Sequence, residues 1–191
     1  MITFACCLWG DWPAPGWGEE YVRRLRAGVD RHLSQPHGFV CFADDPARLA
    51  DEPDMDVRPL RPASWRGCLP KTYVYSPEAG LSGRVLLFDL DNVITGSLDD
   101  MAAYDGDMAV RAWFGGWPKE RIADGDMISF EAGSETAQRL HHRMVSDAVG
   151  VEFYTDGRER WFIRSVVEPD LWQDILGADQ IISYKRHCRL R

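Results

Sequence analysis

The sequence lacks the features that mark membrane, secreted and nucleic-acid-binding proteins. No apolar run approaches the roughly 20 residues that a membrane-spanning helix needs. The N-terminus has no basic stretch followed by a long apolar one, so we expect no signal peptide. The 22 Lys and Arg residues are outnumbered by 30 Asp and Glu residues, and the net charge of −8 argues against broad nucleic-acid binding. We expect a cytoplasmic protein with no transmembrane segment and no nucleic-acid partner.

The five cysteines form no CxxC pair, the spacing that is common at structural zinc sites and redox centres. An odd number of cysteines without metal spacing is typical of reduced thiols in the cytoplasm. Cys6, Cys7 and Cys41 lie within apolar runs, where a buried cysteine behaves as a small hydrophobic residue. We therefore expect these three to be core residues.

The composition is that of an ordered protein, with 45% hydrophobic and 27% charged residues, and the 191 residues suffice for one domain with its own core. Short β-rich runs alternate with segments of helical spacing, which predicts an α/β fold with a mainly parallel central sheet. The predicted strands cover residues 2–8, 39–42, 57–60, 84–90, 108–113 and 127–130, and the predicted helices cover residues 20–33, 69–75, 98–104 and 134–149. Residues 161–166, 171–176 and 180–184 complete the chain, the last of these segments as a strand.

Two aspartates follow the most apolar of these strands. Val85 to Phe88 form a continuous apolar run, typical of a strand buried on both faces of a parallel sheet, and Asp89 and Asp91 come directly after it. Ligands of open α/β sheets bind at the carboxyl ends of the strands. In extended backbone, residues two apart point to the same side, so we expect both carboxylates to aim at one point. Two hard oxygen ligands of this kind suit Mg²⁺ or Mn²⁺ that carries substrate phosphates.

The run LLFDLDNVITGSLDDM resembles the DxD segment of the A-type glycosyltransferases, especially the retaining transferases related to glycogenin and the bacterial galactosyltransferases. ITFACCLWGD resembles their first strand and nucleotide-cradling loop, and FVCFADD resembles their second strand, whose end meets the base or ribose. WRGCLPKTYVYSPE resembles the segment that brings a lysine towards the donor, and DGDMISFEAGS resembles the strand that lines the sugar pocket. With IISYKRHC, which resembles a late segment of bacterial members, the resemblance spans nearly the whole chain.

This resemblance implies a Rossmann-like, nucleotide-sugar-binding domain of the glycosyltransferase A type that acts as a hexosyltransferase. The donor would be a nucleoside diphosphate sugar, with uridine as the expected nucleoside, and the acceptor an unidentified glycan, lipid or protein. Asp89 and Asp91 would hold Mn²⁺ or Mg²⁺, and Lys71 would assist at the diphosphate. Asp124 and Asp126 would orient the sugar hydroxyls. The residues expected at the donor are Leu8, Trp9, Gly10, Asp44, Asp45, Lys71, Asp89, Leu90 and Asp91.

The chain departs from the family pattern in three places. Asp124-Gly125-Asp126 stands where the family often has Asn-Gly-Ser or Asn-Ser-Gly. Asp156-Gly157-Arg158-Glu159 stands where the family often has Gly-Asp-Gln, which puts a sugar-binding carboxylate there in doubt. The His-Gly segment that usually supplies a third metal ligand is missing, since His187 belongs to the SYK segment. We therefore expect that the glycosyltransferase-like domain over residues 1–191 lacks a usual C-terminal segment, has a weak metal site, or completes the site with another residue.

Two other functions fit part of the sequence. LLFDLDNVI also resembles the opening motif of haloacid dehalogenase-like phosphatases, with Asp89 as nucleophile and Asp91 as acid/base. Ser129 and Lys185 would then supply the later hydroxyl and lysine, although nothing acidic follows Lys185. The other alternative is a non-catalytic domain that binds a nucleotide or sugar. In the Trp113-to-Trp117 segment, the tryptophans are either core residues or acceptor contacts, and the sequence leaves the oligomeric state open.

Overall fold

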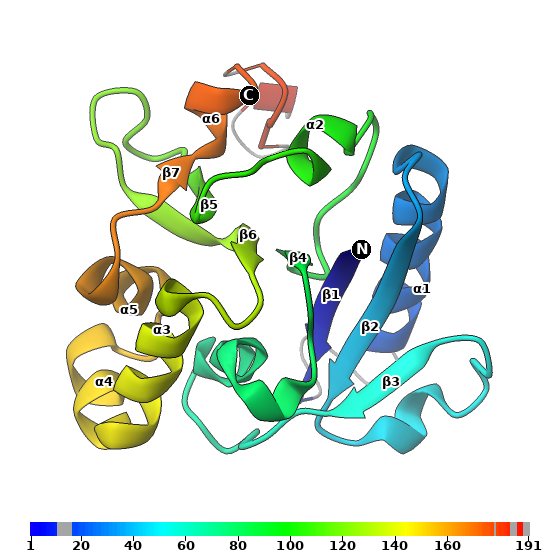
Figure 1. The fold of residues 1–191 in the computed structure, drawn as a ribbon, viewed down its shortest axis with the longest axis horizontal. Coiled ribbons are helices and arrows are strands. Elements are labelled where there is room, and N and C mark those ends of the chain that lie inside the picture. The colour runs from blue at the N-terminus through cyan, green and yellow to red at the C-terminus, as the bar shows by residue number, and fades with distance from the viewer. Residues whose placement is uncertain (11–16, 178, 184–186, 189–191) are drawn as a thin grey trace.

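The computed structural model describes residues 1–10, 17–177, 179–183 and 187–188. In this part of the chain, a seven-stranded sheet has the order β3-β2-β1-β4-β6-β5-β7 and is flanked by helices (Figure 1). The strands are β1 (Ile2–Leu8), β2 (His37–Ala43), β3 (Asp56–Pro59), β4 (Arg84–Phe88), β5 (Met108–Ala112), β6 (Ala123–Glu131) and β7 (Asp170–Leu171). The α-helices are α1 (Trp17–His32), α2 (Asp99–Ala102), α3 (Glu135–Ser146), α4 (Ala148–Thr155), α5 (Glu159–Val166) and α6 (Trp172–Ile175). The 3₁₀ segments are η1 (Pro46–Leu49), η2 (Leu69–Tyr75) and η3 (Pro77–Ala79). The predicted α/β fold with a mostly parallel sheet is confirmed.

The strand order places a topological switch point between β1 and β4. The chain runs from β1 through β2 to β3 on one side, and then returns to β4 on the other side of β1, with β1 parallel to both β2 and β4. In open α/β sheets, the crevice at the carboxyl ends of such strands is the usual ligand-binding position. Strand β6 is antiparallel to β4 and β5, so its first residues reach the same edge of the sheet as the ends of those two strands.

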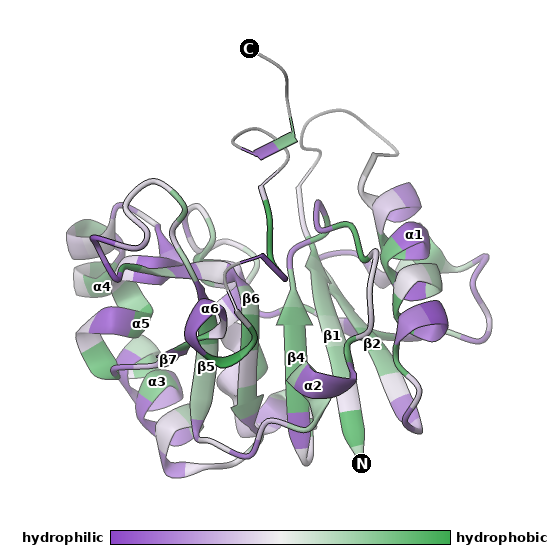
Figure 2. Cartoon of the chain, turned by 90° about the horizontal axis from the view of Figure 1, so that it is seen from above, coloured by the Kyte–Doolittle hydropathy of each residue, from purple (hydrophilic) through white to green (hydrophobic). Residues whose placement is uncertain are grey.

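The core lies on both faces of the sheet, because strand residues alternate between the two sides. Along β1, Phe4 and Cys6 pack on the face covered by α1, α2 and α6, whereas Ala5 and Cys7 pack on the face covered by η2, α3 and α5. In Figure 2 the strands β1, β2 and β4 are largely hydrophobic, whereas α1 shows much of its hydrophilic side. Cys6, Cys7 and Cys41 are buried free thiols, as predicted.

Several predicted elements differ from the structure in extent, number or type. The strand predicted over 84–90 ends at Phe88, and the helix predicted over 69–75 is a 3₁₀ segment. The predicted helix over 134–149 is two helices, because Asp147 ends the first and caps the second by accepting a hydrogen bond from the Gly150 N–H at 3.0 Å. The strand predicted from residue 127 begins at Ala123, because pairing with an arginine on β5 allows Asp124 and Asp126 to lie in a sheet. Residues 180–183 form no strand, and Tyr184 lies outside the described residues.

Across the described ranges, the helices are too short or too polar to cross a membrane.

Candidate functional site

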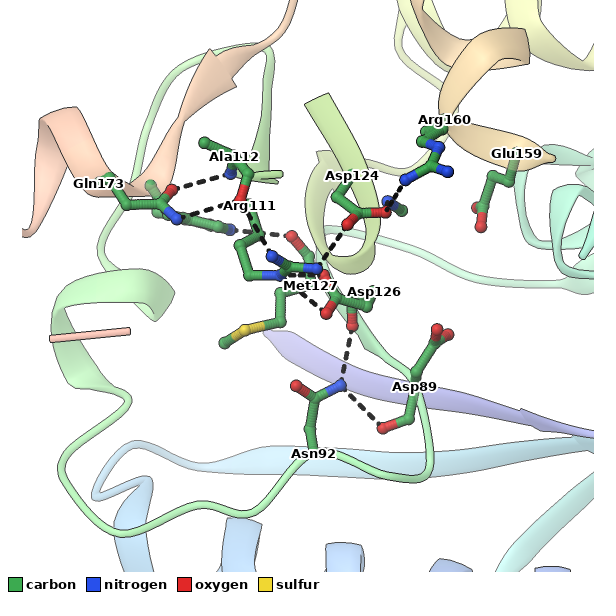
Figure 3. A network of polar contacts seen from close by, with 12 residues as sticks. Asp89, Asn92, Arg111, Ala112, Asp124, Asp126, Met127, Glu159, Arg160 and Gln173 are labelled. Atoms are coloured by element: carbon green, nitrogen blue, oxygen red, sulfur yellow. Dashed lines mark hydrogen bonds and ion pairs between the residues drawn. The ribbon is translucent and has the colours of Figure 1, made fainter. Parts of the chain in front are cut away.

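The chain turns sharply at the end of β4, so the prediction of extended backbone from Asp89 to Asp91 was wrong. The Asn92 N–H donates to the Asp89 carbonyl at 3.2 Å, and the Asp89 N–H donates to the Asp126 carbonyl at 2.9 Å. The Asn92 side-chain amide closes the turn by donating to both carbonyls, at 3.0 and 3.1 Å (Figure 3). The turn leaves Asp91 exposed, while one oxygen of Asp89 contacts a buried lysine.

That lysine is Lys71, which the family resemblance assigns to the diphosphate of the donor and which in the structure contacts Asp89. Its side chain is only 3% exposed, and its Nζ donates to Asp89 Oδ1 at 2.5 Å and to the Gly125 carbonyl at 2.7 Å. Nζ also lies 2.6 Å from Glu159 Oε2 in an ion pair. Burial opposes the charge of an ammonium group, but Asp89 and Glu159 outweigh this effect and hold the pKa of Lys71 well above its usual value. Lys71 thus makes two hydrogen bonds and one further ion pair, which is with Glu159.

Glu159 is the residue that sequence reasoning missed. Its side chain is 2% exposed, and its Oε1 has no hydrogen-bond partner among the described residues. Burial raises the pKa of Glu159 to about 7, although Lys71 favours the charged form. The sequence offered one signal, because Glu159 belongs to the segment that replaces Gly-Asp-Gln. The structure gives that segment a buried carboxyl group.

A tight backbone contact holds the two segments that supply Lys71 and Glu159. The Cys68 N–H donates to the Gly157 carbonyl at 2.8 Å. Gly67 has a φ of +63°, and a Cβ built there would lie 2.5 Å from the Gly157 oxygen, so the close approach requires glycine. An ion pair of 3.0 Å between Arg66 and Asp156 lies at the same junction. The start of η2 is thereby fixed against the turn that begins α5.

Asp124 and Asp126 meet Arg111 of β5, a partner that the sequence analysis did not assign. Arg111 Nε lies 2.6 and 2.7 Å from the two oxygens of Asp126, and its Nη2 lies 2.6 Å from Asp124 Oδ2. Figure 3 shows this fork together with Arg160, whose Nη1 is 3.8 Å from Asp124 Oδ1. Burial raises the pKa of Asp126 in spite of Arg111. A single arginine within a strand as apolar as β5 was the signal for a carboxylate partner.

The ends of β1 and β2 are joined through Gly10 and Asp44. The Gly10 N–H donates to Asp44 Oδ2 at 2.8 Å, while Arg48 donates to the Gly10 carbonyl at 2.9 Å and lies 3.2 Å from Asp44 Oδ1. Asp45 instead accepts a hydrogen bond from the Ala47 N–H, which caps η1. Trp9 packs against the core. The structure thus brings Gly10 and Asp44 together, whereas the Asp45 side chain serves a local turn.

The donor set at this edge suits a metal ion that arrives with phosphates. The carboxylates are Asp89, Asp91, Asp124, Asp126 and Glu159, and they outnumber the cations, which are Lys71, Arg111 and Arg160. Asp89 Oδ2 makes no hydrogen bond to a described residue, and Asp91 has no ion-pair partner there. Within the same ranges, no group of three or more His, Cys, Asp or Glu side chains is arranged to hold a metal. Mg²⁺ is often held by one or two carboxylates plus substrate phosphates and water, and the Asp89–Asp91 turn fits that mode.

Comparison with known proteins adds no assignment. No protein-family model matches the sequence. No curated protein sequence matches it either. The function therefore rests on the geometry of this sheet edge.

Proposed function

We propose that this chain is a metal-dependent glycosyltransferase of the A-type fold that uses a nucleoside diphosphate sugar, with UDP as the expected carrier. One observation carries the proposal. Asp89 emerges from β4 at the switch point beside β1, one of its oxygens contacts buried Lys71, and Asp91 lies exposed on the same turn. This is the position at which open α/β sheets bind phosphorylated ligands.

The neighbouring strand ends supply the length that a nucleoside diphosphate needs. Strands lie about 4.8 Å apart, so the ends of β2, β1 and β4 span roughly 10 Å. The Gly10–Asp44 contact would face the nucleoside, and the Asp89 turn would face the diphosphate. Leu8, Trp9 and Leu90 flank these positions, and they remain predicted donor contacts.

Asp89 and Asp91 would hold Mn²⁺ or Mg²⁺, with donor phosphates and water completing the coordination. A bound cation of this kind supplies positive charge to the leaving diphosphate. Lys71 would add a fixed charge beside Asp89. Glu159 is a positioning residue, because its carboxyl group lies against the Lys71 ammonium on the side away from solvent.

Asp124 and Asp126 keep their predicted role of orienting the sugar, with one refinement. Arg111 pairs with both carboxylates, so a sugar hydroxyl would bind through the lone pairs that the guanidinium leaves free. Asp124 is the better candidate, since its Oδ1 lies 3.8 Å from Arg160 and is not fully neutralised.

The phosphatase alternative has less support. Ser129 is fully buried and pairs with Leu86, three positions before Asp89 along β4. Its hydroxyl lies near Arg84 at the opposite end of the strand. Lys185 lies outside the described residues.

The proposal is tested by thermal stability with Mn²⁺, with UDP and with both. Ligands that bind only the folded state raise the melting temperature by mass action. We expect a larger shift with both ligands than with either alone, and loss of the difference in Asp91→Ala. Asp100→Asn, which changes another exposed aspartate beyond the turn, should keep it. No response to UDP, with stabilisation by Mg²⁺ and beryllofluoride, would favour the phosphatase instead.

Turnover is then measured as UDP release from UDP-glucose and UDP-galactose. Asp89→Asn should lower the rate by at least about 100-fold, because it removes a charge at the point where the leaving diphosphate must be stabilised. Circular dichroism should show an unchanged fold. A rate equal to that of the unmodified protein would refute the metal assignment.

A further inference from the structure

A ladder of alternating guanidinium groups and indole rings extends from Asp124 along α5. We define the arginine–tryptophan ladder as Trp113, Arg160, Trp161 and Arg164. The Arg160 guanidinium carbon lies 5.8 Å from the Trp113 ring centroid and 5.6 Å from that of Trp161. The Arg164 guanidinium carbon lies 5.5 Å from the centroid of the Trp161 ring. At these distances a guanidinium is attracted to the ring.

The cations of this ladder are poorly neutralised. Arg160 has one carboxylate contact, Asp124, at 3.8 Å, which is longer than a hydrogen bond. Arg164 is exposed and forms no ion pair with a described residue. A stacked guanidinium keeps its N–H edge available, and that edge matches the geometry of carboxylate and phosphate groups. In a chain of net charge −8, these two arginines are held against indole rings and lack a close carboxylate among the described residues.

The ladder begins at the candidate site but lies away from the expected donor position. Helix α5 supplies Glu159 to the Lys71 cluster and Arg160 to Asp124 (Figure 3). Trp113 follows β5, on the side of β6 opposite β4 and β1. The exposed ring of Trp161, which is 40% exposed, adds a flat apolar surface of the kind that packs on sugar rings.

We propose that the arginine–tryptophan ladder binds the acceptor, and that this acceptor is a saccharide carrying a phosphate or carboxylate group. The inference rests on the proposed glycosyltransferase function. The donor occupies the β2-β1-β4 side of the sheet edge, and the acceptor approaches over Asp124 from α5. The anionic group contacts Arg160 and Arg164 while a sugar ring lies on Trp161.

The test measures binding of three probes by tryptophan fluorescence: glucose 6-phosphate, glucuronate and glucose. We expect at least one anionic probe to bind at about tenfold lower concentration than glucose. A preference for one anion identifies the recognised group. Arg160→Gln/Arg164→Gln should lose about tenfold in affinity for that anion and little for glucose. Arg31→Gln makes a charge change on exposed α1 and should keep the preference.

Equal binding of glucose and both anions, or an unchanged preference in the double variant, would overturn the inference. Competition between the anionic probe and UDP with Mn²⁺ would also overturn it, because the ladder would then belong to the donor site. The UDP and Mn²⁺ melting shift is measured on the same samples. A UDP shift without anion preference defeats only the inference. An anion preference without a UDP shift defeats the proposed function and with it the acceptor assignment.

Discussion

Two ion clusters at the same sheet edge each set one cation between two carboxylates, and they differ in how well the cluster is satisfied. Arg111 meets both oxygens of Asp126, one oxygen of Asp124 and the Ala112 carbonyl. Lys71 meets Asp89 and Glu159; Lys71 and Glu159 are almost fully buried, and Glu159 Oε1 has no hydrogen-bond partner within the described ranges. The Arg111 cluster pairs its cation with both carboxylates, whereas the Lys71 cluster leaves a buried carboxylate oxygen without a hydrogen bond.

The difference has a physical consequence. An arginine fork matches carboxylates in a fixed plane, whereas a lysine is a point charge that leaves distant oxygens unpaired. Burial, with a smaller contribution from the Asp89 charge, raises the pKa of Glu159 to about 7, although Lys71 lowers it. Perturbed carboxyl groups of this kind gather at functional sites. The comparison directs attention to the Lys71 cluster as the chemically active one.

Replacing the cation of each cluster should show the difference in stability between the two clusters most clearly. Lys71→Met leaves two carboxyl groups without their cation, and the side chain of one of them, Glu159, is only 2% exposed, so we expect a loss of about 3–5 kcal/mol in the free energy of unfolding. Arg111→Met should cost less, about 1–3 kcal/mol, because Asp124 and Asp126 have side chains 22% and 24% exposed and can be hydrated. Urea denaturation at pH 7.5 measures both values.

The double variant Lys71→Met/Glu159→Gln serves as the control for the larger loss. It removes one of the stranded carboxyl groups, and it should recover part of the stability of Lys71→Met. Equal losses in Lys71→Met and Arg111→Met would show that the two clusters do not differ as described.

The pH dependence of stability should identify Glu159. Its pKa rises from 4.5 in the unfolded chain to about 7 in the folded one, so the folded state binds more protons between these values. The stabilisation is complete below about pH 4.5 and is lost as pH rises through about 7. Relative to Glu159→Gln, the unmodified protein should lose about 3 kcal/mol between pH 4 and pH 8.

The measurement is chemical denaturation at pH intervals across this range. Asp89 remains in both proteins, and because its charge raises the pKa of Glu159, the difference between the two curves includes this coupling. Parallel stability curves would mean that the pKa of Glu159 is the same in the folded and unfolded protein, and the contrast with the Arg111 cluster would fail.

The sequence predicts the sheet well because the strands carry their own signal. Val85 to Phe88 is apolar on both sides, and β1 buries alternate residues on two faces, so neither strand depends on a distant partner for recognition. The family resemblance singled out Lys71 as a residue of the site, and the structure shows its contact with Asp89. These features are local, or they are linked by motifs of known order.

The positions of the other site residues depend on long-range contacts that no local sequence pattern encodes. The antiparallel direction of β6 decides that Asp124 and Asp126 meet Arg111, and hydrophobic periodicity carries no information on direction. The Asp89 turn depends on Asn92 and on a carbonyl of β6. Glu159 reaches Lys71 because Gly67 and Gly157 let the segment before η2 and the segment before α5 approach closely.

The smallest expected effect concerns Gly125, a glycine in β6 that contacts the Lys71 cluster. A Cβ built at this position would lie 2.6 Å from Glu159 Oε2 and 2.9 Å from its Cδ, while the Gly125 carbonyl accepts from Lys71. Glu159 is held by its ion pair and has little freedom to move aside. Gly125→Ala should therefore destabilise the protein by about 1–3 kcal/mol, measured by urea denaturation, through overpacking.

Gly38→Ala is the matched control, since it also lies in a strand and its added Cβ would meet nothing within 4 Å. Reduced entropy of the unfolded chain should make Gly38→Ala neutral or slightly stabilising. Shortening the opposing side chain in Gly125→Ala/Glu159→Asp should recover part of the loss, because the carboxyl group then withdraws from the new methyl. Equal losses in the two alanine variants would point to a general intolerance of strand alanines. A loss confined to Gly125, with recovery in the double variant, would locate the strain between β6 and Glu159, where the Lys71 cluster differs from the Arg111 cluster.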